Sequence, residues 1–284
     1  MIASELYNKL STDFMRESIS DVDWASRMPN LDKHLFPTFK ENGGIGLMCD
    51  FTNQIEKVFT TVFLSNKVLL SLLNKDISNA MIFSHHPTRW DLKEHNGNYA
   101  PNEEYVAALK DKNISVFILH HPLDHFGKYS TCGTLAKELK MDAIVPAFLY
   151  MGAYCGVIGT TDCETITDLQ HCYSQVVGHK TRVYDYGKER IKGEQVAVCP
   201  GGGNAMFVVD ELMNHNIKIL ITGVTIVNDY TQKTHEFEKQ HKINVLGGTH
   251  YSSEKFAPMS MCEYFNDLGL PSEFICDEPD LFDL

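Results

Sequence analysis

Residues 79–87 read NAMIFSHHP, and this stretch decides the fold of the chain. Its first part is almost continuously apolar, which is typical of a strand covered by helices on both faces of its sheet. Two histidines, His85 and His86, follow that run directly. The stretch therefore predicts a buried strand that carries two imidazoles to one end of a sheet.

The same pattern recurs along the chain. Short runs of strand length, rich in Val, Ile and Phe, lie at residues 55–63, 79–84, 114–119, 154–160, 180–185, 195–199, 217–222, 243–247 and 272–276. Between many of them lie segments with 3.6-residue periodicity, among them EEYVAALKD, TLAKELK, ETITDLQHCYSQVV, NAMFVVDELMNHN and SEKFAPMSMCEYFNDLG. This alternation predicts an α/β fold with mostly buried sheets flanked by helices. In such sheets ligands bind beyond the carboxyl ends of the strands.

The longest apolar run covers residues 144–159 and includes Pro146, Gly152 and Gly156. It is shorter than the roughly 20 residues of a membrane-spanning helix. We interpret it as a loop that leads into a buried strand.

The composition excludes several classes of partner. The 284 residues carry 37 acidic and 25 basic side chains, a net charge of −12, without a Lys/Arg-rich run. Nucleic acids and anionic membranes require concentrated positive charge, so we expect neither as a partner. The amino-terminal residues lack the basic and apolar regions of a secretory signal, and the eight cysteines are scattered without a Cys-x-x-Cys pair. We therefore expect a cytoplasmic protein with reduced, mostly buried thiols.

Three predicted strands run into clusters of metal-ligand residues. His85 and His86 follow the first strand, His120 to His125 follow the strand ISVFIL, and residues 249–254 follow the strand INVLGG. Imidazoles and carboxylates suit Zn, Fe, Mn or Ni, and one cation requires three or more of them. The candidate ligands are His85, His86, His120, Asp124, His250 and Glu254.

Six ligands exceed the number that one open tetrahedral site requires and suit two divalent ions that share a carboxylate or a water. The neighbours His85 and His86 point to opposite sides of a strand, so they can serve two ions, or one can bind while the other orients it. The pairs His120 with Asp124 and His250 with Glu254 are each four residues apart, which places each pair on one face of a helical turn.

Weaker motifs leave alternatives open. The turn Cys199-Pro200-Gly201-Gly202-Gly203-Asn204 opens a predicted helix, and it is either an anion cradle or a tight turn that requires glycine. His235-Glu236 with His241 fails the spacing of a zinc-peptidase helix, so we expect a solvated helix face there. Any single histidine cluster is also compatible with strand ends that bind nothing.

The order of these motifs resembles the Nif-three-like dinuclear metal-centre proteins, also called GTP cyclohydrolase 1 type 2 homologues. The resemblance extends from about Gly44 to Ile275. It implies two interlinked α/β lobes with a dinuclear metal cleft, the six ligands named above, and a ring-shaped homohexamer. The metal-binding lobe would comprise residues 1–130 and 242–284, and the second lobe residues 131–241. The sequence departs from the family pattern at Glu41–Leu47, in the glycine turn, and at Thr249, which places any shared substrate pocket in question.

The leading hypothesis is a metal-dependent hydrolase in which a metal-bound hydroxide attacks a small-molecule substrate. Asp124 or Glu254 would bridge the ions, and His121 or His125 would carry protons. A second hypothesis, suggested by the family name, is opening of the GTP imidazole ring, although the sequence contains no guanine-recognition motif. A third is a non-catalytic, metal-binding or regulatory assembly.

Overall fold

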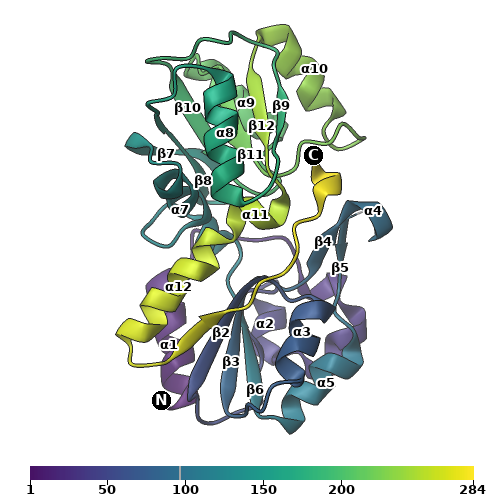
Figure 1. Ribbon diagram of the computed structural model, residues 1–284. Helices are drawn as coiled ribbons and strands as arrows, with labels where there is room; N and C mark the ends of the chain where they lie inside the picture. The colour runs from purple at the N-terminus through teal and green to yellow at the C-terminus, as the bar shows by residue number, and fades with distance from the viewer. Residues whose placement is uncertain (96) are drawn as a thin grey trace. The chain divides into compact units, whose positions relative to one another are not determined.

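The computed structural model describes residues 1–95 and 97–284 (Figure 1). The chain forms two compact units. Unit 1 comprises Met1–Leu123 and Pro258–Glu278, and unit 2 comprises Asp124–Ala257 and Pro279–Leu284. Residues 242–257, which the sequence analysis placed with the metal-binding lobe, lie in unit 2, because their strand β12 (Asn244–Gly247) pairs with β11 (Ile219–Thr222) there.

Unit 1 is built on a five-stranded sheet in the order β1-β6-β3-β2-β13. Its strands are β1 (Gly46–Cys49), β2 (Lys57–Phe63), β3 (Ala80–His86), β6 (Ile114–Ile118) and β13 (Ser272–Phe274). The pairings of β13 with β2, β2 with β3, and β3 with β6 are parallel, and β1 is an antiparallel edge strand. The carboxyl ends of β3 and β6 therefore meet at one edge of the sheet.

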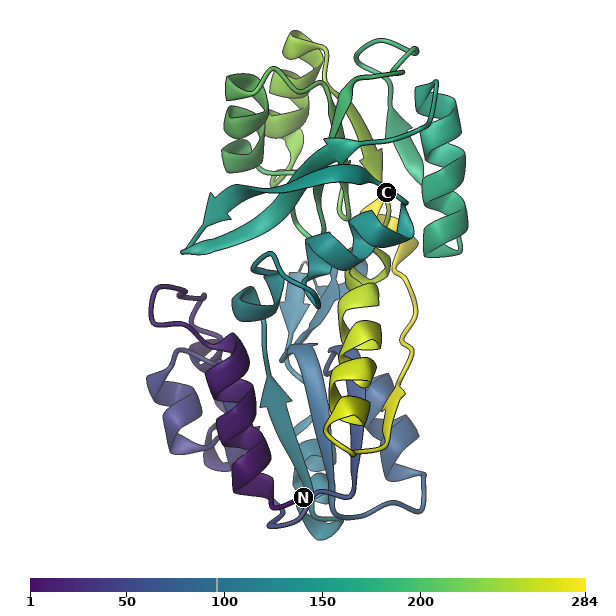
Figure 2. The same cartoon turned by 90° about the vertical axis from the view of Figure 1, so that its left-hand side faces the viewer.

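Helices cover both faces of this sheet. On one face, α3 (Asn66–Leu73) and α5 (Glu103–Asp111) pack apolar side chains against Ile82 of β3. On the other face, Tyr7 of α1 (Ala3–Phe14) stacks on Phe117, and Phe265 of α12 (Phe256–Asp267) meets Phe83 edge to face. Figure 2 shows α1 and α12 lying along these strands. The remaining elements are η1 (Ala25–Arg27), η2 (Pro29–His34), α2 (Pro37–Glu41), β4 (Arg89–Asp91), α4 (Leu92–His95) and β5 (Gly97–Tyr99).

Unit 2 contains a six-stranded sheet in the order β7-β8-β10-β11-β12-β9. Besides β11 and β12, its strands are β7 (Asp142–Tyr150), β8 (Ala153–Thr160), β9 (Arg182–Tyr184) and β10 (Gln195–Cys199). One face carries α7 (Thr131–Glu138) and α8 (Ile166–Val177), and the other carries α9 (Met206–Asn214) and α10 (Gln232–His241). The short elements α6 (His121–Asp124), α11 (His250–Glu254) and η3 (Leu281–Asp283) complete the structure.

These two sheets confirm the α/β fold. The interpretation of residues 144–159 as a loop that leads into a buried strand is correct for the strand, which is β8, but wrong for the loop, because residues 144–150 belong to β7. The run forms most of the antiparallel hairpin of β7 and β8, in which Tyr150 pairs with Ala153. Met151 and Gly152 connect the strands with φ of +46° and +86°, the left-handed backbone of a two-residue hairpin turn. Pro146 is tolerated because β7 is an edge strand.

The parallel strands β10, β11 and β12 place their carboxyl ends side by side in unit 2. The glycine turn follows β10, and α11 follows β12 after a short connection. In the part of the chain that the structure describes, no helix is long and apolar enough to cross a bilayer.

Candidate metal-ligand groups

The first ligand group lies at the carboxyl ends of β3 and β6 in unit 1. Ser84 and Ile118 pair in parallel register, so His85 and His86 at the end of β3 lie beside His120, which follows β6. One ring nitrogen of each histidine lies within 4.8 Å of those of the other two. The side chains are buried, with residue exposures of 0%, 2% and 9%. The three imidazoles therefore have the separation and the shielding from solvent that a metal ion requires.

Hydrogen bonds to the Nδ1 atoms fix the tautomers of two of these histidines. His85 Nδ1 lies 3.0 Å from the carbonyl oxygen of Leu119, and because a carbonyl only accepts, Nδ1 carries the proton. His120 Nδ1 lies 2.8 Å from Oδ1 of Asp21 and donates to that carboxylate. In its neutral form each ring then carries its lone pair on Nε2, the arrangement that outer hydrogen bonds impose on metal-binding histidines.

Asp21 contacts the candidate ligand His120, and sequence reasoning missed it. Its side chain is fully buried and accepts hydrogen bonds from Trp24 Nε1 at 3.1 Å and from the backbone N–H of His121 at 3.1 Å, in addition to His120. Burial acts to raise the pKa of Asp21, but the attraction of His120 and His121 outweighs it and holds the pKa well below its ordinary value. The carboxylate is therefore a permanently charged acceptor behind His120.

The second ligand group lies on α11 in unit 2. His250 and Glu254 are one turn apart, and Nε2 lies 3.2 Å from Oε1. Thr249, the departure from the family pattern, caps this helix, because its hydroxyl accepts from Ser252 N while the Ser252 side chain accepts from Thr249 N. Asp283 Oδ2 accepts the backbone N–H of His250 at 2.8 Å. The orientation of both ligands is thus set by a capped helix start.

The glycine turn after β10 lies against this second group. A Cβ atom at Gly201 would overlap Oε1 of Glu254 and lie 3.0 Å from Nε2 of His250. The Gly201 N–H donates to Ser253 Oγ at 2.9 Å, and the Gly203 N–H donates to the Pro200 carbonyl at 3.2 Å. Because these amides are already bonded within the chain, the structure favours the tight turn over the anion cradle.

Asp124 is also held in place within unit 2. Its Oδ1 atom accepts a hydrogen bond from the hydroxyl of Thr131 at 2.7 Å. The thiol of Cys132 donates to the Asp124 carbonyl at 3.7 Å, and burial raises the pKa of that thiol to about 12. Cys132 therefore stays protonated at neutral pH.

His121 and His125, the candidate proton carriers, occupy different environments. His121 is buried, and its Nδ1 donates to the Ser20 carbonyl at 3.0 Å, so its neutral ring can accept a proton at Nε2. His125 Nδ1 accepts the backbone N–H of Tyr154 at 3.2 Å, so its neutral ring carries the proton on Nε2. The two rings therefore present opposite tautomers.

The prediction of a solvated helix face around His235 is only partly correct. Glu236 is exposed, but His235 is buried, and its Nε2 contacts the Thr225 carbonyl at 2.8 Å and Asn204 Nδ2 at 3.2 Å. Glu238, three residues on, is completely buried with Oε2 at 3.2 Å from His235 Nδ1. The helix turns this pair toward the loops that follow β10 and β11, which periodicity alone did not reveal.

The fold and the site thus define an α/β protein in which parallel strands end in buried imidazoles and carboxylates, the side chains that serve as metal ligands. A family model described as Duf34/NIF3 (NGG1p interacting factor 3) matches residues 31–279, and the chain belongs to this family. The resemblance inferred from the histidine motifs is thereby confirmed.

Curated relatives carry one name. The chain is 25% identical over 232 residues to the "GTP cyclohydrolase 1 type 2 homolog" of Pyrococcus horikoshii, a match that covers 79% of this chain and 86% of the relative. It is 24% identical to the protein of the same name from Pyrococcus abyssi, over 88% of this chain and 95% of the relative.

Solved structures share the fold. The structure titled "protein ybgI, unknown function" matches with a TM-score of 0.75 at 19% identity and covers 99% of this chain and 100% of its own. Reduced HcgD from Methanocaldococcus jannaschii matches with a TM-score of 0.69 at 16% identity, over 98% of both chains. At identities of 19% and 16%, these matches show a shared fold alone.

Proposed function

We propose that this protein binds two divalent metal ions as a dinuclear centre. The proposed ligands are the residues His85, His86, His120, Asp124, His250 and Glu254. Membership of the Duf34/NIF3 family and the two ligand groups support this assignment. The observation that carries it is the buried cluster in unit 1, where the Nδ1 atoms of His85 and His120 donate to fixed acceptors.

The donor set fits a transition metal. Four imidazoles and two carboxylates favour Zn, Fe, Mn or Ni over Mg or Ca, which prefer all-oxygen sites. Because Gly201 has no side chain, Glu254 and His250 have room to lie against its backbone. Asp124 or Glu254 would be the ligand that the two ions share, because each carboxylate has two oxygens.

We further propose that the centre hydrolyses a small-molecule substrate. When bound, the ions would supply Lewis acidity that lowers the pKa of a water from about 15.7 to about 7. The chain's own residues would move the protons: His121 is suited to accept one at Nε2, and His125 to donate one from Nε2. This division follows from the opposite tautomers of the two rings.

Metal content tests the binding proposal. Protein purified without a metal-affinity tag should contain close to two equivalents of transition metal by elemental analysis, and Glu254→Ala should contain less. Glu263→Ala, which changes an exposed glutamate of α12, is the matched control and should retain the metal. Metal-free wild-type protein that also fails to take up Zn, Fe, Mn or Ni would refute the proposal.

A metabolite screen on metal-loaded wild type and Glu254→Ala tests hydrolysis. GTP is the first compound to assay, because the curated relatives are named for a GTP cyclohydrolase. Metal-dependent consumption of a substrate other than GTP would support the general hydrolase, and formation of a ring-opened GTP product would support the alternative. Loaded protein that turns over no nucleotide, phosphoester or cyclic amide would favour a non-catalytic, metal-binding assembly.

We also propose that the protein acts in the cytoplasm as a homohexamer. The eight cysteines are scattered along the sequence without a Cys-x-x-Cys pair, a pattern that suits reduced thiols in a reducing compartment. The hexamer rests on the family resemblance alone. Light scattering coupled to size-exclusion chromatography should give six times the chain mass of 32.2 kDa, and a monomer would refute it.

A further inference from the structure

A basic pocket lies at the amino ends of β11 and β12 in unit 2. It has a volume of about 270 Å³. Four cationic residues line it: Lys188, Arg190, Lys218 and Lys242. Glu194 is the one carboxylate among the lining residues, and Ile191 and Ile219, both buried, give the pocket an apolar part. The concentration of positive charge contrasts with the net charge of −12 of the whole chain.

A buried asparagine fixes the backbone that carries these cations. Asn244 is 2% exposed, its Oδ1 accepts the N–H of Gly187 at 2.6 Å, and its Nδ2 donates to the Lys188 carbonyl at 2.8 Å. Its backbone N–H donates to the Lys218 carbonyl at 2.8 Å. Asn244 therefore ties the segment after β9 to the segment before β11. These hydrogen bonds fix the backbone on both sides of the pocket.

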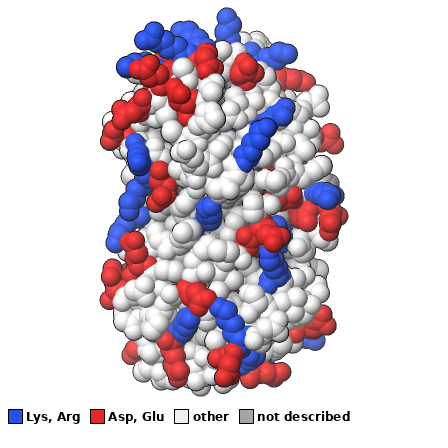
Figure 3. Space-filling view, in the orientation of Figure 1, with Lys and Arg blue, Asp and Glu red and all other residues white. Residues whose placement is uncertain are grey.

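The pocket cations lack carboxylate partners. Elsewhere in unit 2, Lys192 pairs with Glu164 at 2.6 Å. Within the described residues, none of the four cations in the pocket has a carboxylate oxygen inside the 4.0 Å limit of an ion pair. Four like charges around one small volume repel one another, and a bound anion relieves that repulsion. Figure 3 shows Lys and Arg side chains crowded at the upper end of the molecule, over unit 2, beside acidic ones.

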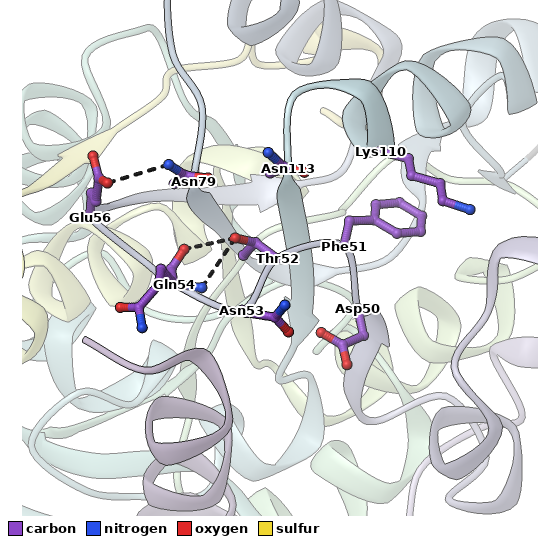
Figure 4. A pocket seen from close by; sticks show the side chains of 9 residues that line it. All are labelled: Asp50, Phe51, Thr52, Asn53, Gln54, Glu56, Asn79, Lys110 and Asn113. Atoms are coloured by element: carbon purple, nitrogen blue, oxygen red, sulfur yellow. Dashed lines mark hydrogen bonds between the residues drawn. The ribbon is translucent and has the colours of Figure 1, made fainter.

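A second pocket, in unit 1, shows that this charge is not a general property of the strand ends. That pocket has a volume of about 550 Å³ and is lined by Asp50, Glu56 and several amides, with Lys110 as its one cation (Figure 4). It also lies at the amino ends of parallel strands, since Asn79 and Asn113 directly precede β3 and β6. Two carboxylates beside one ammonium disfavour an anion there.

We propose that the basic pocket binds a small molecule carrying a phosphate monoester. A dianionic phosphate presents three terminal oxygens to ammonium and guanidinium groups, and Arg190 can bind two of them at once. The apolar part formed by Ile191 and Ile219 suits the organic portion of such a ligand. The volume lies near the lower limit of small-molecule pockets, and the negative charge of the whole chain opposes the long polyanion of an RNA. The proposal does not depend on the metal centre.

Calorimetric titration with AMP, inorganic phosphate and adenosine tests the proposal on the metal-loaded protein. AMP should bind saturably, inorganic phosphate more weakly, and adenosine without measurable affinity. Lys188→Gln and Arg190→Gln should each weaken AMP about tenfold, as expected for the loss of a charge-assisted hydrogen bond. Lys192→Gln removes the same charge from an exposed neighbour that does not line the pocket, and Lys110→Gln removes it from unit 1. Both controls should bind AMP within twofold of wild type.

Four outcomes would overturn the proposal. In the first, wild-type protein binds neither AMP nor phosphate at millimolar concentration. In the second and third, Lys188→Gln and Arg190→Gln leave the AMP affinity unchanged, or the Lys192→Gln control loses as much affinity as they do. In the fourth, the protein binds a single-stranded RNA but does not bind AMP. Thermal melting of each variant verifies that it is folded, and Lys218→Gln provides a third pocket variant should either of the others fail to fold.

Discussion

Asp21 holds His120 with both of its carboxylate oxygens, at 2.8 Å and 2.9 Å from Nδ1, although the two residues are 99 positions apart in the sequence. This contact leaves Nε2 as the candidate ligand atom of His120 and gives the ring a negative partner. The same arrangement raises ligand basicity in known metal sites.

Asp21→Asn should weaken metal binding about 10- to 100-fold, the usual cost of losing an outer-shell partner. The amide has nearly the same shape but lacks the charge, and it accepts through one oxygen only. Competition with a chromophoric chelator measures the affinity. Asp23→Asn is the control, since Asp23 lies two residues away and caps the exposed Ser26 N–H. Wild-type affinity in Asp21→Asn would show that Asp21 does not support a ligand.

Gly201→Ala should disrupt the ligand group of unit 2. The added methyl group would overlap Glu254 Oε1, and Gly201 has φ of +61°, where alanine is strained by roughly 1 kcal/mol. We expect a lower metal affinity together with a lower free energy of unfolding in urea.

Gly202→Ala is the matched control for that change. Its Cβ would meet Tyr230 OH at 3.5 Å, an ordinary contact, and Gly202 is outside the left-handed region. This variant should keep the metal and most of the stability. Equal metal affinity in both alanine variants would show that Glu254 does not require the space at Gly201.

Glu238 should make stability depend on pH. Burial raises the pKa of Glu238 above its ordinary value, more than the neighbouring His235 lowers it. Since the unfolded carboxyl has a pKa of about 4.3, the folded state holds the proton more tightly, and stability falls as pH rises from about 4.3 through the folded pKa. Glu238→Gln removes that loss, so its melting temperature should exceed that of wild type by more at pH 8 than at pH 4.5.

The exposed Glu236 provides the control for this titration. Glu236→Gln lies on the same helix and should show the same pH dependence as wild type. If the melting temperature of Glu238→Gln depends on pH as that of wild type does, the pKa of the buried carboxyl is the same in the folded and unfolded states.

Asp283 should stabilise the start of α11. Asp283→Ala leaves the buried N–H of His250 without its acceptor, which costs about 1–3 kcal/mol of unfolding free energy. Asp283→Asn keeps an acceptor oxygen and should lose less than half of that amount. Urea denaturation followed by circular dichroism gives both values, and equal losses in the two variants would assign the effect to something other than this hydrogen bond.

Local patterns in the sequence predicted the buried strands and their ligand residues. The runs at 79–84 and 114–119 became β3 and β6, and their apolar continuity is the direct result of helices on both faces. His85, His86 and His120 come together because parallel neighbours end at the same sheet edge. Strand β7 was missed because Pro146 and Gly152 are typical of loops, whereas an edge strand and a left-handed turn accommodate them.

Residues that act through tertiary contacts left no local signal. Asp21 lies in an irregular segment far from any strand, and only folding brings it to His120. Asp283 is also distant from His250, because the two positions are 33 apart in the sequence. Gly201 did carry a signal, because a glycine-rich turn after a strand indicates close backbone approach, but the sequence did not identify Glu254 as the group approached.

Removal of metal should destabilise the wild-type protein through linkage. An ion that binds the folded state alone stabilises it by about 2.7 kcal/mol at 100 times its dissociation constant. A chelator should therefore lower the melting temperature of wild type, and added Zn should restore it. His86→Ala removes a buried candidate ligand and should respond weakly to both treatments, whereas His171→Ala, at an exposed histidine of α8, should respond like wild type. A melting temperature that is indifferent to chelator in fully metal-loaded wild type would contradict the coupling of metal binding to folding.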